Sequence, residues 1–361
     1  MTVSASIAAP NHLDWAERND YWQSTATSKS QRSRSARETK PLILTGHGVS
    51  IALDRGTLLI RNGLTHFPQE REIFRLFKGD LELPSRIIML DGSGRLTFDV
   101  ISWLSDQAVP LVQIDYTGRV ISVIGGSGFA SDPEKVRWQI ETRNDPERRL
   151  AFCCNLIAEK LKSSVRTLND VVPDSSARAI AIARAEGCIN LLRNGRLKSV
   201  EDVRMVEAQA AASYFRAWKS ISLKWRSLWK HPIPDNWLTI GSRGTLSRAK
   251  LATNRNARHP VNAMLNYAYG VLYSKGHIDA LVRGFDPRRG IMHHDRDDGD
   301  ALAMVFDLVE PSRPTVDAAV LKFIQIEPLR PADFVVNSSG VCRLVPGLAR
   351  AIAAVATNAC D

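Results

Sequence analysis

The spacing of the apolar residues changes once along the chain, near Gly125, and this change constrains the fold more than any other feature of the sequence. From Pro41 to Gly125 the apolar residues occur in short runs separated by turn residues such as Asp54-Arg55-Gly56, which is typical of strands joined by tight turns. From about residue 130 to 355 they recur every three or four residues, which is typical of packed helices. The sequence therefore predicts an α+β protein, with a small N-terminal β-rich domain followed by a larger, all-α-helical domain.

The predicted elements follow this division. Strands are expected at 42–44, 50–53, 57–60, 86–90, 110–115 and 119–124, with one helix at 97–104. Helices are expected within 132–168, 175–194, 200–218, 259–273, 300–310 and 315–326. The predicted domains are a basic, flexible tail at 1–40, the β-rich domain at 41–125 and the helical domain at 126–361.

The tail is predicted from its composition. Ser24–Lys40 is rich in Ser, Thr, Lys and Arg and contains almost no apolar residue, so it cannot bury enough surface to offset its ordering entropy. Its basic residues can either contact DNA or remain solvated. Upstream, Trp15, Tyr21 and Trp22 can dock a short helix on the rest of the protein.

The balance of charges is the first indication of function. The chain has 48 Lys and Arg against 38 Asp and Glu, a net charge of +10 and a pI of about 9.6. Such a surface favours nucleic acid, because neutralising phosphates releases counterions, but a small anionic ligand is the alternative. The five cysteines form no CxxC pair, which argues against a zinc site or a disulfide framework and for the reducing cytoplasm. Without a signal peptide or an apolar run of membrane-spanning length, no contact with a membrane is expected.

Glu207 and His293 are polar residues in apolar surroundings. Glu207 lies in 205–218, whose alanines allow neighbouring helices to approach closely. A carboxylate there either faces water or is paired with a cation or a metal. His293 and His294 follow the apolar pair Ile291-Met292, so one ring can face inward as a ligand, although an isolated histidine is more often structural.

Asp307 and Glu310 lie three positions apart in the apolar stretch 302–314, so they project from nearly the same side of a helix. Their partner is either Arg313 or a hard cation. Carboxylates together with an imidazole suit Mg²⁺ or Mn²⁺ better than a metal that prefers thiolates. Such an ion beside a basic groove is suited to phosphodiester chemistry, because it stabilises both the attacking and the leaving oxygen.

Six motifs in order resemble the CRISPR-associated integrase of the adaptation machinery, the spacer-acquisition endonuclease family. The first two are the strand–helix–strand segment 90–120 and the long helices within 137–168. The others are EAQAAASYF (207–215), RHPVNAMLNYAYGVLY (258–273), GFDPRRGIMHH (284–294) and LAMVFDLVEPSRPTVD (302–317). Together the motifs cover about residues 42 to 350.

The resemblance implies a metal-dependent DNA endonuclease and integrase that inserts captured DNA into a repeat array. The 3′-hydroxyl of the captured duplex would attack a phosphodiester directly. The resemblance places the Mg²⁺ or Mn²⁺ ligands at Glu207, His293 and Glu310, with Asp307 as an accessory carboxylate. It also implies a homodimer formed through the N-terminal domains, assembly with a small ferredoxin-like second adaptation protein, and double-stranded DNA as substrate. The alternatives are a transposase-like relative outside CRISPR and a non-catalytic DNA-binding scaffold.

The chain also departs from the motifs of this family. Arg288 and Arg289 add positive charge next to the expected metal, which is consistent with a grip on phosphate. His294 leaves an ambiguity of one position for the histidine ligand. Five further basic residues precede the Pro–x–Asn–Ala helix and are either phosphate contacts or a solvated basic face: Arg243, Arg248, Lys250, Arg255 and Arg258.

Overall fold

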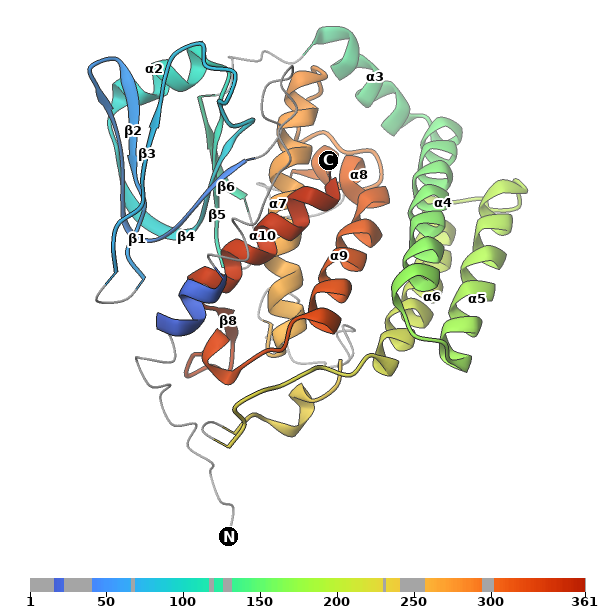
Figure 1. Ribbon diagram of the computed structural model, residues 1–361. Helices are drawn as coiled ribbons and strands as arrows, with labels where there is room; N and C mark the ends of the chain where they lie inside the picture. Colours follow the sequence, from blue (N-terminus) through green and yellow to red (C-terminus); the bar gives the residue numbers. More distant parts are fainter. Residues whose placement is uncertain are drawn as a thin grey trace.

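An N-terminal sheet of six strands lies beside a mostly helical remainder in the computed structural model, so the predicted α+β class is confirmed (Figure 1). The structure describes residues 16–22, 41–65, 69–116, 120–125, 132–229, 232–240, 257–293 and 302–360. None of the helices in these ranges is long and apolar enough to span a membrane.

The sheet has the strand order β3-β2-β1-β4-β5-β6, in which β4 pairs in parallel with β1 and β5 and the other pairs are antiparallel. Its strands are β1 (Leu42–Asp54), β2 (Thr57–Arg61), β3 (Ile73–Leu76), β4 (Ile87–Leu96), β5 (Leu111–Ile114) and β6 (Val120–Ile124). β1 joins two runs that the sequence predicts as separate strands. It continues through Gly46 and Gly48, whose φ angles of 86° and 78° are accessible to glycine and accompany shifts in the register with β4.

The two faces of the sheet pack against different partners. One face is covered by α2 (Phe98–Asp106), where Trp103 and Leu104 are buried against strand residues such as Ile87. On the other face, Ile88 and Val112 join the core of the helical remainder. Because successive side chains of a strand point to opposite faces, β4 and β5 contribute to both cores.

The helical remainder begins with α3, and its helices pack in two groups. One group, α4 to α6, lies at the right in Figure 1, while α7 runs through the middle of the other group beside α8, α9 and α10. The helices are α3 (Pro133–Asn144), α4 (Pro146–Val171), α5 (Ser176–Arg193), α6 (Val200–Ala217), α7 (Pro260–Val282), α8 (Ala303–Val309), α9 (Arg313–Ile326) and α10 (Pro346–Cys360).

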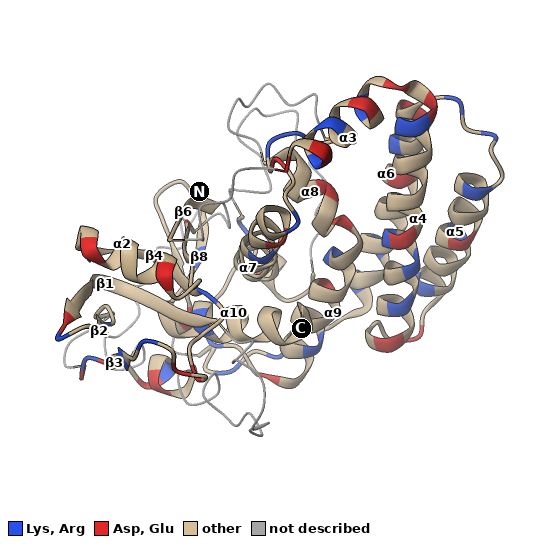
Figure 2. Ribbon diagram, turned by 90° about the horizontal axis from the view of Figure 1, so that it is seen from above, with Lys and Arg blue, Asp and Glu red and all other residues tan. Residues whose placement is uncertain are grey.

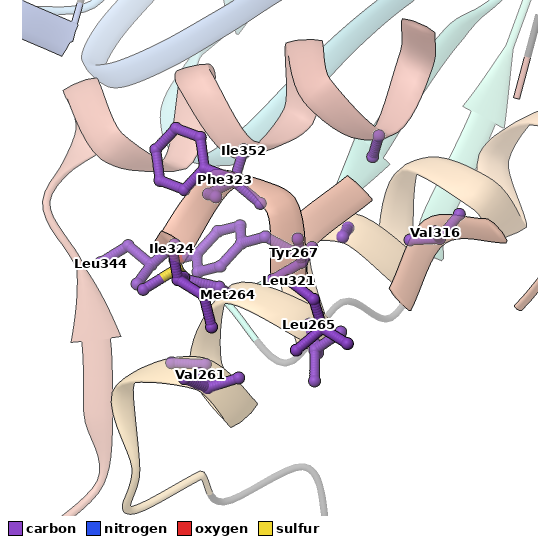
Figure 3. Close-up of a cluster of buried hydrophobic side chains, with 14 of the residues drawn as sticks. Val261, Met264, Leu265, Tyr267, Val316, Leu321, Phe323, Ile324, Leu344 and Ile352 are labelled. Carbon is purple, nitrogen blue, oxygen red and sulfur yellow. The ribbon is translucent and has the colours of Figure 1, made fainter. Parts of the chain in front are cut away.

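Three helices and a strand form the centre of the second group. Figure 3 shows its apolar side chains, with Val261, Met264, Leu265 and Tyr267 from α7 facing residues of α9 and α10. The approach of α7 to α8 is close at Gly276, where an added Cβ would lie 2.3 Å from Cγ1 of Val309. This packing sets the position of α8 and therefore of the segment that follows it.

Some elements differ from the sequence prediction. The expected helical stretch 132–168 is divided at Asp145, because Pro146 starts a new helix whose first backbone N–H groups bond to the Asp145 carboxylate at 2.9 and 3.1 Å. The remainder is not all α-helical, since β7 (Phe334–Val336) and β8 (Cys342–Leu344) form a small hairpin. The strand β3 and the helix α10 are also additions to the predicted elements.

Within the segment predicted as a tail, residues 16–22 form a helix that docks on the helical remainder. Arg18 binds both carboxylate oxygens of the buried Asp333, with Nε–Oδ1 and Nη2–Oδ2 distances of 2.6 and 2.8 Å. The indole N–H of Trp22, which is fully buried, donates to the same carboxylate at 3.0 Å. The docking that the sequence predicts for Trp22 is therefore confirmed.

We expect Arg18→Ala to lower the free energy of unfolding by about 3 kcal/mol, because it leaves a buried carboxylate without its cation. The matched control is Arg75→Ala, which breaks an ion pair with Asp54 whose side chains are 42% and 40% exposed, and for which we expect less than about 1 kcal/mol. Urea unfolding of both variants measures the difference. Equal small losses would contradict a stabilising role for the docked helix.

Candidate active site

Two predicted metal ligands, Glu207 and Glu310, share one lysine. Glu207 lies in the middle of α6, which begins with a capping box between Ser199 and Asp202. Glu310 lies where α8 gives way to a short 3₁₀ turn, and it is 1% exposed. The Lys160 ammonium on α4 donates hydrogen bonds to Oε1 of both carboxylates. Elements far apart in the sequence therefore meet at one partly buried cluster of charges.

Glu310 has a second cation on its other oxygen. The Arg313 Nε lies 3.2 Å from Oε2 of Glu310, and Arg313 also donates to the Tyr273 hydroxyl at 2.8 Å. Burial raises the pKa of the Glu310 carboxyl, but the charges of Arg313 and Lys160, followed by that of His293, hold this pKa at about 2. Glu310 is therefore ionised at neutral pH, although almost no water reaches it.

His293 is oriented by Asp307. The ring Nδ1 lies 2.7 Å from Oδ1 of Asp307, and the buried carboxylate also accepts the backbone N–H groups of residues 291, 292 and 293 at 2.6, 3.1 and 3.3 Å. A carboxylate only accepts hydrogen bonds, so the ring donates from Nδ1, and in the neutral ring Nε2 keeps its lone pair. This carboxylate–histidine arrangement is typical of a histidine that binds a metal through its other nitrogen.

The segment before His293 is also held through its backbone carbonyls, which the sequence does not reveal. Gln139 of α3 donates to the carbonyls of residues 286 and 289 at 3.0 and 2.7 Å. Arg149 of α4 donates to the carbonyl of Ile291 at 3.0 Å, and Arg204 of α6 donates to that of Met292 at 2.8 Å. Helices from both sides thus fix the backbone that carries the histidine.

Two of the three predicted ligands, Glu207 and Glu310, meet at Lys160, whereas the predicted DNA contacts are spread out. Arg288 and Arg289 are exposed just before His293, and Arg289 pairs with Asp286 at 2.8 Å. Arg258 is exposed before the first residue of α7, and the 23 residues of that helix span about 35 Å. Arg258 therefore lies at the other end of α7 from the histidine segment. Four of the predicted contacts and the alternative ligand lie outside the described residues: Arg243, Arg248, Lys250, Arg255 and His294.

The donor set suits a hard divalent cation, although the side chains are not arranged around one. Within the described ranges, no three His, Cys, Asp or Glu side chains are grouped so that they could hold a metal ion. The place that a metal ion would take between Glu207 and Glu310 is held by the Lys160 ammonium. Carboxylate oxygens and one imidazole nitrogen are ligands that Mg²⁺ and Mn²⁺ accept, so the residues fit such an ion once the ammonium leaves.

The family model described as "CRISPR associated protein Cas1" matches residues 42–356. The chain belongs to the Cas1 family. A curated Cas1 endonuclease of Archaeoglobus fulgidus is 24% identical over an alignment of 305 residues that covers 81% of this chain and 80% of that relative. The resemblance predicted from the six motifs is therefore confirmed.

Solved structures agree with the Cas1 assignment. A casposase bound to its integration product superposes with a TM-score of 0.71 at 22% identity, over 89% of this chain and 82% of that one. A chain of a Cas6-RT-Cas1–Cas2 complex gives a TM-score of 0.65 at 17% identity, over 90% of this chain and 32% of the other. At these identities the two structures establish the fold that this member of the Cas1 family adopts.

We expect Asp307→Asn to lower the free energy of unfolding of this Cas1 family member by about 2 kcal/mol, because an amide nitrogen would then face buried backbone donors. The control is Asp286→Asn, in the same segment, where the side chain accepts the backbone N–H of Arg288 at 2.9 Å and an asparagine oxygen can replace it. Thermal unfolding compares the two variants. A larger loss for Asp286→Asn would show that Asp307 does not hold the segment.

The stability of the metal-free protein should depend on pH through Glu310. Its pKa of about 2 lies below the ordinary 4.5, so its stabilising contribution is complete above pH 4.5 and is lost as the pH falls toward 2. In the presence of a chelator, wild type should exceed Glu310→Gln by about 3 kcal/mol at pH 7 and by clearly less at pH 3. Urea unfolding at both pH values measures this, and a difference independent of pH would contradict it.

Proposed function

We propose that this Cas1 family member is a divalent-metal-dependent DNA endonuclease and integrase of CRISPR adaptation. The observation that carries the proposal is the meeting of Glu207 and Glu310 at Lys160, together with the orientation of His293 by Asp307. These are the residues that the family resemblance assigns as metal ligands. The integration product held by the casposase, a structural relative, supports the same kind of reaction on this fold.

In this proposal, Glu207, His293 and Glu310 hold Mg²⁺ or Mn²⁺, which would activate the attacking 3′-hydroxyl and stabilise the leaving oxygen. Asp307 keeps the proton of His293 on Nδ1, which leaves the lone pair of Nε2 available as a metal ligand. Arg313 keeps Glu310 ionised and fixes one of its oxygens. The Tyr269 and Tyr273 rings lie 5.7 and 5.6 Å from the Arg313 guanidinium and hold it in place.

The DNA backbone would lie along the basic helices that lead to the site. Figure 2 shows charged residues, many of them Lys and Arg, recurring along α4 and α5, whereas α7 and α10 are almost uncharged. Arg288 and Arg289 are exposed beside His293, where they can bind phosphates of double-stranded DNA. Such contacts position a substrate without selecting its sequence.

The proposed assembly is a homodimer formed through the N-terminal β-rich domain, 41–125, with the catalytic domain at 126–361. The partner would be a second adaptation protein of the Cas2 type, small and ferredoxin-like, since one structural relative is part of a complex with Cas2. We place the protein in the cytoplasm, where the repeat array is found. Cross-linking of the purified chain with and without the partner would test the assembly.

We expect Glu207→Gln to abolish the joining of labelled duplex ends to a plasmid, with a loss of at least about 100-fold, because a neutral amide is a poor ligand for Mg²⁺ or Mn²⁺. Duplex binding should change by less than about threefold, because the basic surface remains. The matched control is Glu201→Gln, earlier on α6, whose side chain is 69% exposed. Strand joining that survives Glu207→Gln would contradict the proposal.

The same assay separates the alternatives. A non-catalytic scaffold would bind duplex tightly, yet wild type would join no ends in Mn²⁺. A transposase-like relative outside CRISPR would join ends but show no preference for a repeat array over random plasmid sites. We expect that a chelator abolishes strand joining, and that the ends join more often at the repeat array than at random plasmid sites.

A further inference from the structure

Lys160 occupies the place between two proposed metal ligands. Its side chain is 15% exposed, and its ammonium bonds to one oxygen of Glu207 and one of Glu310. The lysine is fixed by its helix, because α4 packs against both α6 and the 3₁₀ turn that carries Glu310. The Lys160 ammonium is therefore a cationic partner of both carboxylates at once.

The ammonium and a divalent cation need the same oxygens. Mg²⁺ binds carboxylate oxygens at about 2.1 Å and demands a nearly ideal octahedral shell. An ammonium that bonds to the same oxygens blocks this shell, and its charge repels the ion at short range. The ion can therefore bind both glutamates only after the Lys160 ammonium has moved away from them.

The charges of the cluster indicate what draws the ammonium away. Glu207 and Glu310 carry two negative charges, and Lys160 and Arg313 carry two positive charges, so the cluster is neutral. A bound divalent cation leaves an excess of two positive charges. In a site for DNA, the anion that offsets this excess is a backbone phosphate, which also offers the displaced ammonium a new partner.

We propose that Lys160 is an internal competitor for the metal, which keeps the metal affinity low until DNA supplies a phosphate that takes the ammonium. This inference rests on the proposed function and extends it, because the lysine makes the binding of the metal and of DNA cooperative. Thermodynamic linkage makes the effect reciprocal: the metal must strengthen DNA binding by the same factor by which DNA strengthens metal binding. The metal would then occupy the site mainly when the DNA substrate is bound.

The test is calorimetric titration of the full chain with Mn²⁺, with and without a short duplex, at neutral pH. For wild type we expect the duplex to tighten Mn²⁺ binding by about tenfold or more. Lys160→Met should bind Mn²⁺ about tenfold more tightly than wild type without DNA, and the duplex should add little. The matched control is Lys78→Met in the β-rich domain, whose lysine is 56% exposed and pairs with Asp106, and this variant should behave as wild type.

Lys160→Met keeps the Arg313 partner of Glu310, and circular dichroism checks that it folds. Lys160→Gln is a second variant that removes the charge but retains a donor for one carboxylate, and it should also bind Mn²⁺ more tightly. If both variants bind Mn²⁺ as weakly as wild type or more weakly, Lys160 does not compete with the metal. The proposed function would still stand in that case if the binding of Mn²⁺ is lost in Glu207→Gln. If no variant and no wild-type sample binds Mn²⁺, the proposed function and this inference both fall.

Discussion

A carboxylate that is removed from water must be compensated by cations or by several donors, and the helical part of this protein is organised around that constraint. Asp307, Glu310, Asp317 and Asp333 are all 2% exposed or less. Each is held in a different way: by backbone N–H groups and an imidazole, by two cations, by two tyrosine hydroxyls, or by an arginine with an indole. Because a buried charge without partners is costly, these contacts restrict how the helices can pack.

The same constraint links architecture to chemistry. Glu310 can remain ionised inside the protein because α4 brings Lys160 and the start of α9 brings Arg313 to its two oxygens. The segment that carries His293 has little regular structure of its own, and it is positioned by side chains of α3, α4, α6 and α8 bonded to its backbone. A site of this kind depends on the relative placement of many elements, which suits the proposed reaction because that reaction needs several groups held in one geometry.

Most of the fold and the candidate ligands could be predicted from the sequence, whereas their partners from distant elements could not. The change of apolar spacing near Gly125 indicates the fold class, and the polar residues in apolar helices indicate Glu207 and Glu310. Arg313 follows from its spacing three positions after Glu310. Lys160 could not be predicted as their shared partner, because it lies 150 positions before Glu310, and a lysine on an amphipathic helix is normally solvated. The strand β3 escapes prediction because it lies at the edge of the sheet, where its residues alternate between exposed and half buried.

The docking of residues 16–22 has a consequence for biosynthesis. Arg18 and Asp333 are separated by 315 positions, so the anchor for the first helix is among the last parts of the chain to leave the ribosome. At a translation rate of about 5 to 20 residues per second, the helix waits about 15 to 60 s for its acceptor. During that interval the indole of Trp22 has no finished core to enter. Nascent chains that stall before Asp333 emerges would therefore leave the Trp22 indole exposed to water and the Arg18 guanidinium without its carboxylate.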